Sequence, residues 1–246
     1  MPFFRVSALC RWCTYWLLWP FMMILLPGIH RICSQAPGIV GPYPNWMGRV
    51  SLRIFGIRVT SNLNSLALPQ DGCVFLANHR SWIDQVVLYA VIPRPIRFVA
   101  KAGYFKIPIL AASLKITGHY SVDRQKDESY RQLFRRIRED LQAGHAIVMY
   151  PEGTRSTSDR FLRFERGPFL IAGRTAVPVI ATHIFGTLKI LNKNSSLLSL
   201  RPGNVQVYFE PPEVLAPCQA DREAVAAYQK RFVDVHESIG KTLSDK

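Results

Sequence analysis

From residue 57 onward, short apolar runs alternate with longer segments in which apolar residues recur every three or four positions. A short apolar run indicates a strand buried on both faces, and the longer period indicates a helix with one buried face. We expect strands at Arg58–Thr60, Cys73–Ala77, Ile96–Ala100, His119–Val122, Ala146–Tyr150, Val177–Ile184 and Val205–Phe209, and helices at Trp82–Val91, Tyr104–Thr117, Lys126–Ala143, Gly167–Thr175 and Ala220–Leu243. This alternation predicts a single α/β domain with a mostly parallel or mixed sheet flanked by helices.

The N-terminal part follows a different pattern, because Trp12–Ile29 carries no charge. As a straight helix it would span about 27 Å, which is marginal for crossing a membrane, and Pro20 would kink or break it. We therefore expect a membrane-embedded helical segment that either spans the bilayer or re-enters one leaflet as a hairpin. Arg11 and Arg31 flank it on both sides, so the positive-inside rule gives no orientation. A hairpin would leave both flanks on the cytoplasmic face.

A basic amphipathic helix is expected next, at Asn45–Ile57, where Arg49 and Arg53 lie one turn apart beside Trp46 and other apolar residues. It either lies on a membrane surface or packs on the domain core with its arginines in solvent. The sequence thus divides into a membrane-associated helical part, residues 1–57, and an α/β domain, residues 58–246.

Charge sharpens this picture, because the 246 residues carry a formal net charge of +14 while 48% are apolar. Such a balance points to an anionic partner. The expected helix Lys126–Ala143 carries four arginines, and their face either is solvated or docks an anionic partner: Arg131, Arg135, Arg136 and Arg138. No nucleic-acid motif is present and the aromatic residues crowd the N-terminal segment, which argues against nucleic acid. The five cysteines show no framework spacing and predict neither a disulfide nor a zinc site.

The first motif whose residues could take part in catalysis is NHRSWID, Asn78–Asp84. His79 and Asp84 would lie about 140° apart on a continuous helix, so the helix should begin between them. Ser81, three residues before Asp84, has the pattern of a helix cap. His79 then lies in the preceding loop, where Asp84 can accept a hydrogen bond from one ring nitrogen and leave the other free as a general base. The alternative is a capping carboxylate beside an incidental surface histidine.

The second motif is YPEGTRS, Tyr150–Ser156, which follows the apolar run Ala146–Met149. Strand ends are where α/β folds place their chemistry. Gly153 lets backbone approach a ligand, Arg155 can hold a phosphate through two parallel hydrogen bonds, and Thr154 adds a hydroxyl. The alternative is a turn without function.

Together the two motifs resemble those of the glycerolipid acyltransferase family, the lysophosphatidic acid acyltransferases and their relatives. That family carries N-H-x-x-x-x-D and, further along the chain, [FY]-P-E-G-T-R-S, and both are present here in that order. The segment Val99–Arg124 resembles the second family block, with Lys101 near its start and Asp123 and Arg124 at its end.

The resemblance extends over roughly Gly72–Phe185. Phe161–Phe169 resembles the continuation after the second motif. In the fourth block, Ala176–Ile180 keeps one proline, but Ala181 stands where many members have a second. This departure weakens an inference about the acceptor pocket more than one about the fold.

The resemblance implies a membrane-bound acyltransferase whose catalytic domain is residues 58–246. It would move a fatty acyl group from an acyl thioester, acyl-CoA or acyl carrier protein, to the free hydroxyl of lysophosphatidic acid, giving phosphatidic acid in phospholipid biosynthesis. No cofactor is expected, because the acyl donor is itself a substrate. The expected location is the membrane, with the catalytic domain on the cytoplasmic face, the inner membrane if the source is bacterial. Anionic lipid and an acidic acyl carrier protein are the expected partners of the basic surface.

The resemblance also implies roles for single residues, with His79 as the base and Asp84 fixing its tautomer. The acceptor phosphate would be held by Glu152, Gly153, Thr154 and Arg155, where Glu152 orients either Arg155 or a glycerol hydroxyl. Asn78 either positions His79 or donates to the oxyanion. Lys101 and Arg124 bind phosphate or the donor's pantetheine and nucleotide, or are surface cations.

Two alternatives stay open at this point. One is an acyltransferase for another lysophospholipid or a lyso-ornithine lipid. The other is a non-catalytic membrane protein that binds anionic lipid, which would explain the charge and the first 57 residues but not the pairing of His79 with Asp84.

Overall fold

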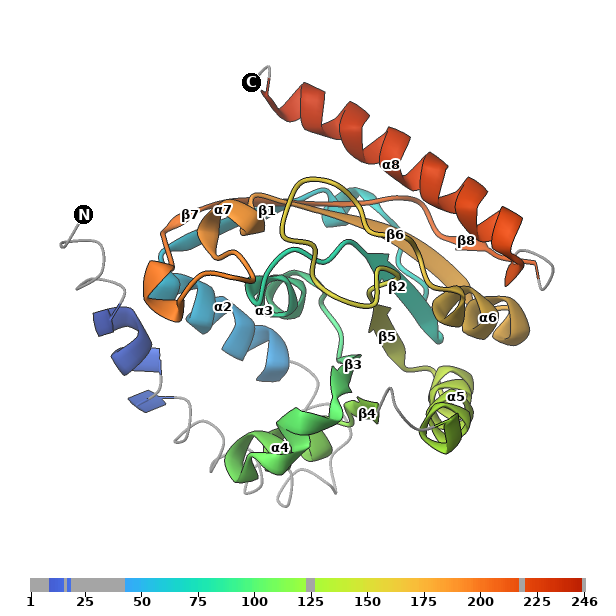
Figure 1. Ribbon diagram of the computed structural model, residues 1–246, viewed down its shortest axis with the longest axis horizontal. Coiled ribbons are helices and arrows are strands. Elements are labelled where there is room, and N and C mark those ends of the chain that lie inside the picture. Colours follow the sequence, from blue (N-terminus) through green and yellow to red (C-terminus); the bar gives the residue numbers. More distant parts are fainter. Residues whose placement is uncertain (1–8, 16, 19–42, 123–126, 217–219, 245–246) are drawn as a thin grey trace.

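The fold is a mixed β-sheet with helices on both faces (Figure 1). The computed structural model describes residues 9–15, 17–18, 43–122, 127–216 and 220–244. Along the sheet the strand order is β1-β7-β6-β2-β5-β3-β4, and β8 pairs with β6. The strands are β1 (Ile57–Ser61), β2 (Cys73–Ala77), β3 (Ile96–Lys101), β4 (Tyr120–Val122), β5 (Ala146–Met149), β6 (Pro178–Phe185), β7 (Gly203–Phe209) and β8 (Glu213–Val214). The predicted α/β domain with a mixed sheet is confirmed.

The centre of the sheet is parallel, since β2 pairs with β5 and β6, β5 pairs with β3, and β3 pairs with β4. By contrast, β7 and β8 run antiparallel to β6, and β1 runs parallel to β7. Parallel neighbours end at the same edge of a sheet, where open α/β folds place their ligands. The loops that follow β2, β5 and β3 therefore meet at one edge.

The helices lie on the two faces of this sheet (Figure 1). On one face, α2 and α3 pack with Phe75 of β2, and on the other α5, α6 and α8 pack with Leu76. Central strands with both faces covered are apolar throughout, which is why they were predictable as continuous apolar runs. The helices are α2 (Tyr43–Phe55), α3 (Ile83–Val91), α4 (Pro108–Ile116), α5 (Asp127–Gln142), α6 (Arg166–Thr175), α7 (Thr187–Ile190) and α8 (Arg222–Ser244), with short 3₁₀ turns η1 (Leu63–Ser65), η2 (Ala102–Lys106) and η3 (Leu197–Ser199).

The prediction of a single helix at Tyr104–Thr117 was wrong, because the segment is divided into η2 and α4. The break falls at Ile107, whose backbone is extended at φ −89° and ψ 112°. Pro108 follows, and a proline disfavours the helical conformation in the residue before it. The short elements α7 and β8 were not predicted, since four and two residues are too few to show a period.

The predicted amphipathic helix is α2, which ends at Phe55 rather than at Ile57 because Ile57 begins β1. It packs on the domain core: Phe55 is 1% exposed, and Gly48 lies so close to α3 that an added Cβ would stand 2.7 Å from the Ala90 nitrogen. Trp46, however, is 52% exposed. The inner face of α2 therefore packs on the domain core, as one of the two alternatives predicted. The outer face of α2 carries a large apolar side chain in solvent.

Residues 9–15 and 17–18 are helical and lie against the domain. The Trp12 indole nitrogen donates a hydrogen bond of 2.7 Å to the Leu197 carbonyl, and the Trp12 ring lies 4.9 Å from that of Phe55. Across these described parts of the chain, no helix has both the length and the apolar character needed to cross a bilayer. Most of the apolar segment predicted at Trp12–Ile29 lies outside the described residues.

Candidate active site

The two motifs meet at the sheet edge because β2 and β5 are parallel neighbours, with Leu76 opposite Met149. His79 follows β2 and Glu152 follows β5. The His79 N–H donates to Glu152 Oε1 at 3.0 Å, and the Ser156 N–H donates to the His79 carbonyl at 2.9 Å. Two motifs that lie far apart in the sequence thus form one hydrogen-bonded unit.

His79 and Asp84 are in direct contact, with 2.8 Å between His79 Nδ1 and Asp84 Oδ2. The Asp84 side chain is fully buried and that of His79 is 13% exposed. An ionised carboxylate only accepts hydrogen bonds, so we assign the proton to Nδ1, and the pair leaves Nε2 as the acceptor. An imidazole in this state can take a proton from a nearby hydroxyl.

The same carboxylate oxygen also organises the start of α3. Asp84 Oδ2 accepts the backbone N–H groups of Arg80 at 2.7 Å and Ser81 at 2.8 Å. Ser81 Oγ accepts from the Ile83 N–H at 3.2 Å rather than from Asp84, and α3 begins at Ile83. The prediction that a helix begins between His79 and Asp84 is confirmed. The prediction that Ser81 is the N-cap was wrong, because the N-cap is Trp82, which makes no side-chain capping bond.

The His79 ring is held flat against Tyr150. Their ring centroids are 3.9 Å apart and their planes differ by 14°. Tyr150 is itself enclosed: burial, followed by the nearby Asp84 and Tyr89, raises its pKa well above the usual 10. The imidazole is therefore fixed by a hydrogen bond at Nδ1 and by stacking on its face, which leaves few rotamers open to it.

Glu152 contacts Arg80, not Arg155, which corrects one of the two roles proposed from the sequence. Arg80 Nη1 donates to Glu152 Oε2 at 3.2 Å, and the Leu162 N–H donates to the same oxygen at 2.9 Å. Because Glu152 is 4% exposed and its carboxylate already accepts three donors, it supports the loops instead of facing a ligand. A role in orienting a glycerol hydroxyl has no geometric support.

Arg80 was missed by the sequence reasoning. It is 4% exposed, donates to the carbonyls of Asp159 and Arg160, and lies 4.4 Å over the Phe161 ring. Its place inside the first motif was the only signal, and a single arginine between two polar residues does not reveal that it is buried. It ties the loop after the second motif to the first motif.

Arg155 is the residue of the second motif that could hold an anion. Its guanidinium carbon lies 4.8 Å over the Trp82 ring, and its Nη1 is buried without a hydrogen-bond partner among the described residues. Burial, the largest influence, lowers its pKa, while Tyr104 and Asp84 act in the opposite direction. Burying a guanidinium nitrogen without a partner is unfavourable, and a bound anion would remove that penalty.

The remaining residues of the second motif shape the turn that carries Arg155. Gly153 adopts a positive φ of 66°, a backbone conformation that is unfavourable for residues with a Cβ. Thr154 is exposed next to it.

Asn78 does not face a ligand. It is fully buried, its Nδ2 donates to the Ile184 carbonyl at 2.9 Å, and its Oδ1 accepts the Ile184 N–H at 2.7 Å. The side chain thus extends the pairing between β2 and β6 by one residue. Of the two roles proposed for Asn78, donation to an oxyanion is not supported, and it acts on His79 only by fixing the end of β2.

Lys101, one of the two cations predicted to bind phosphate or the acyl donor, is not bonded to either motif in the described structure. Lys101 is exposed at the end of β3, two strands away from β2, and among the described residues it makes no hydrogen bond or ion pair with either motif. Arg124 lies outside the described residues.

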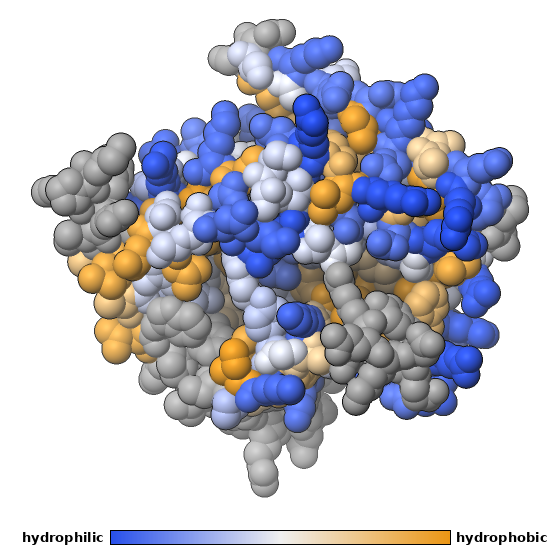
Figure 2. All heavy atoms as spheres, in the orientation of Figure 1, coloured by the Kyte–Doolittle hydropathy of each residue, from blue (hydrophilic) through white to orange (hydrophobic). Residues whose placement is uncertain are grey.

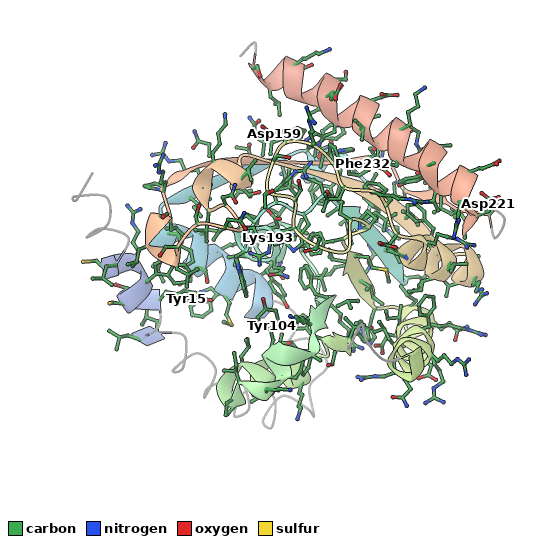
Figure 3. The ribbon with its side chains drawn as sticks, in the orientation of Figure 1. Tyr15, Tyr104, Asp159, Lys193, Asp221 and Phe232 are labelled. Carbon is green, nitrogen blue, oxygen red and sulfur yellow. The ribbon has the colours of Figure 1, made fainter. Side chains whose placement is uncertain are left out.

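A third segment, Leu191–Lys193, also reaches the motifs and was missed. Lys193 Nζ lies 3.2 Å from both Thr154 Oγ1 and the Arg155 carbonyl. Figure 3 shows Lys193 near the middle of the view, with Asp159 above it and Tyr104 below. Its sequence context, a short polar loop without a period, gave no signal.

No cluster of metal-ligating residues occurs in the part of the chain that the structure describes. Within the same part, Cys10, Cys13 and Cys73 are free. A cavity of about 290 Å³ lies between β8 and α8 beside Tyr228 and Arg231, but no motif residue lines it.

Comparison with known proteins places these residues in a wider context. A family model described as Acyltransferase matches residues 56–184, just over half of the 246 residues, and this range includes both motifs. The 1-acyl-sn-glycerol-3-phosphate acyltransferase of Chlamydomonas reinhardtii is 32% identical over 66% of this chain and 50% of its own length. The protein of the same name from Haemophilus influenzae is 29% identical over 83% of this chain and 86% of its own length.

A solved structure is also similar. The crystal structure of the 1-acyl-sn-glycerophosphate (LPA) acyltransferase PlsC from Thermotoga maritima matches with a TM-score of 0.78, over 99% of this chain and 96% of that protein, at 19% identity. At this identity the likeness concerns the fold. The chain spans about half the length of the first curated relatives it matches.

Proposed function

The chain belongs to the Acyltransferase family, and from that membership we propose that it transfers a fatty acyl group from an acyl thioester to the free hydroxyl of lysophosphatidic acid, giving phosphatidic acid. The observation that carries the proposal is the 2.8 Å contact between His79 Nδ1 and the buried Asp84, in the same hydrogen-bonded unit as Arg155. A base and a guanidinium on two loops that are hydrogen-bonded to each other suit an acceptor that has both a hydroxyl and a phosphate. The names of the relatives point to the same acceptor.

In the proposed mechanism, His79 is the general base. Its Nε2 takes the hydroxyl proton while the hydroxyl oxygen attacks the thioester carbonyl, the carbon–sulfur bond breaks, and the proton passes to the departing thiolate. Asp84 fixes the ring tautomer and stabilises the imidazolium that forms between these steps. A positioned base contributes about 10²- to 10⁴-fold to such a reaction.

The acceptor phosphate is proposed to bind at Arg155, whose unpartnered Nη1 offers the donor. Gly153 and Thr154 form the turn beside it. Glu152 and Asn78 act as positioning residues, because both are buried and bonded within the protein. Lys101 and Arg124 are proposed as further cations, for the phosphate or for the pantetheine and nucleotide part of the acyl donor.

The reaction as proposed uses no cofactor, since the acyl-CoA or acyl carrier protein is a substrate. It also needs no acyl-enzyme, because Ser81 is buried and both sides of its hydroxyl are used, in accepting from Ile83 and donating to the Leu191 carbonyl at 2.6 Å.

We propose that residues 1–57 hold the enzyme at the membrane and that residues 58–246 form the catalytic domain on its cytoplasmic face. The support is an apolar surface at the left of Figure 2, where residues 9–15, 17–18 and η3 lie. Its exposed members are Leu9, Leu17, Leu18, Leu197 and Leu198. The exposed arginines of α5 are proposed to contact anionic lipid or an acidic carrier protein.

The test is thiol release from a long-chain acyl-CoA by the purified protein, with and without lysophosphatidic acid. We expect release that depends on the acceptor, reduced at least about 100-fold in His79→Ala. His145→Ala, at a half-buried histidine outside the site, is the matched control and should keep its activity.

Three other outcomes would redirect the proposal. Release with a different lysolipid only would identify another acyltransferase of this family. No release with any lysolipid or acyl donor, despite tight vesicle binding, would identify a non-catalytic lipid binder. A stoichiometric burst of thiol without acceptor would replace direct transfer with an acyl-enzyme.

A further inference from the structure

The segment Leu191–Lys193 contacts both motif loops, with one bond or more from each of its three residues. The Leu191 carbonyl accepts from Ser81 Oγ at 2.6 Å, and Asn192 Nδ2 donates to the Thr157 carbonyl at 3.1 Å. Lys193 Nζ reaches Thr154 Oγ1 and the Arg155 carbonyl, both at 3.2 Å. The segment therefore forms a third side of the site, next to the histidine motif and the arginine motif.

Lys193 brings a second cation to the turn that carries Arg155. An ammonium group has three donors, and this loop takes two of them, so one donor is left within the described surroundings. Lys193 is half-buried, which limits how far its charge can move away from this turn. The segment also lies beyond residue 184, where the matched family model ends. The motifs therefore do not account for this residue.

We propose that Lys193 and Arg155 together form a two-cation site that selects acceptors with a dianionic phosphomonoester over acceptors with a monoanionic phosphodiester. The inference rests on the proposed function, and it assigns the specificity of that site to a residue outside the motifs. Arg155 supplies the planar donor to one face of the phosphate, and Lys193 supplies a compact charge from the loop side.

Charge matching is the physical reason for this selectivity. A phosphomonoester carries between about −1.5 and −2 charges near pH 7, because its second pKa is about 6. A phosphodiester has no second ionisation and carries a single negative charge, about 0.5 to 1 fewer than the monoester. Two cations around one phosphate therefore favour the monoester, whereas Arg155 alone would hold either group.

A competing explanation is that Lys193 only braces the turn through Thr154 and the Arg155 carbonyl. Bracing would affect every acceptor to the same extent, because the turn is the same whichever phosphate binds. Charge selection instead changes the ratio between two acceptors that differ in charge. The ratio of kcat/KM values therefore separates the two explanations.

The experiment compares lysophosphatidic acid with its methyl phosphodiester as acceptors, in the wild type and in Lys193→Met, Lys193→Arg and Lys189→Met. Lys189, a lysine on α7, is the matched control. We expect the preference of kcat/KM for the monoester to fall about tenfold or more in Lys193→Met, the size of one charge-assisted hydrogen bond. Lys193→Arg should keep most of the preference, and Lys189→Met all of it.

A binding measurement keeps this inference separate from the proposed function. The melting temperature of each protein is followed with a short-chain lysophosphatidic acid below its micellar concentration, since a ligand of the native state raises it. Stabilisation that depends on Lys193 without any turnover would support the two-cation site and overturn the acyl transfer. Turnover with an unchanged acceptor ratio in Lys193→Met would overturn the two-cation site alone. Neither turnover nor Lys193-dependent stabilisation would overturn both.

Discussion

Arg80 and Glu152 form an ion pair in the protein interior, and its removal is the sharpest test of how the two motifs are held together. The side chains are 5% and 0% exposed, with 3.2 Å between Arg80 Nη1 and Glu152 Oε2. We consider Glu152→Gln, Arg80→Met and the double variant. Glutamine keeps the shape of Glu152 and one oxygen acceptor, so the first change removes mainly the charge. Methionine keeps an unbranched, flexible side chain at Arg80 without its charge or donors.

The expected effect follows from burial. Removing one partner of a buried pair leaves an uncompensated charge and costs about 3–5 kcal/mol. For a protein of this size, 1 kcal/mol corresponds to roughly 2–4 °C, so each single variant should melt roughly 6–20 °C below the wild type. The double variant contains no unpaired charge, and its loss should be smaller than the sum of the two single losses by about 0.5–3 kcal/mol.

The assay is thermal unfolding followed by tryptophan fluorescence at a fixed detergent concentration. The pair Arg231 and Glu213 provides the control, because these side chains are 48% and 34% exposed and Glu213→Gln should lose only about 0–1 kcal/mol. If Glu152→Gln melts within about 2 °C of the wild type, a shift that corresponds to about 1 kcal/mol or less for a protein of this size, the pair does not join the motifs energetically. Strict additivity in the double variant would likewise contradict the reasoning.

Two further predictions concern other parts of the fold. Burial, with a smaller contribution from Arg97, lowers the pKa of His119 to about 4, and His119 Nδ1 accepts the Phe98 N–H. A histidine whose pKa is lower when folded than when unfolded binds fewer protons in the native state, so the unfolding free energy should fall by about 3 kcal/mol as pH drops from about 6.5 to about 4. His119→Asn, which retains an acceptor for Phe98, should flatten this part of a pH series of denaturant titrations, and an unchanged slope would contradict the assignment. Gly48→Ala should lower the unfolding free energy by about 1–3 kcal/mol, because its Cβ would stand 2.7 Å from the α3 backbone. Gly103→Ala, where a Cβ meets nothing within 4 Å, is the control, and equal losses in the two variants would refute the packing argument.

Much of the fold was predictable, because sheet strands that are buried on both faces appear in the sequence as continuous apolar runs. β2 was predicted with its observed bounds, Cys73–Ala77, because five consecutive apolar residues fit a central strand better than a helix of one turn. The division of Tyr104–Thr117 could have been anticipated from Pro108, which disfavours a helical Ile107. Apolar periodicity across the whole segment outweighed that local signal.

The site was predictable only in part, because motif residues that bind a ligand and motif residues that support the loop look alike in sequence. Glu152 and Arg155 stand three positions apart in one polar turn, yet Glu152 is 4% exposed and bonded on both oxygens while Arg155 has a nitrogen without a partner in the described structure. Burial and hydrogen bonding separate the two roles, and one of the donors to Glu152 is Arg80 from the other motif. Lys193 could not be predicted, since a short polar loop has no period from which its position could be inferred.

The spacing between His79 and Asp84 follows from the fact that one carboxylate oxygen has two tasks. Asp84 Oδ2 accepts a hydrogen bond from His79 Nδ1 at 2.8 Å. It also accepts hydrogen bonds from the backbone N–H groups of Arg80 and Ser81, which precede α3. A residue in the first turn of a helix can reach back to N–H groups that have no partner within the helix, and the loop just before them is the place where a histidine can meet the same oxygen. One inserted residue would move either the histidine or the backbone donors away from Asp84. The fixed spacing of the motif thus reflects the geometry of a helix N-terminus, and the position of the base depends on where α3 begins.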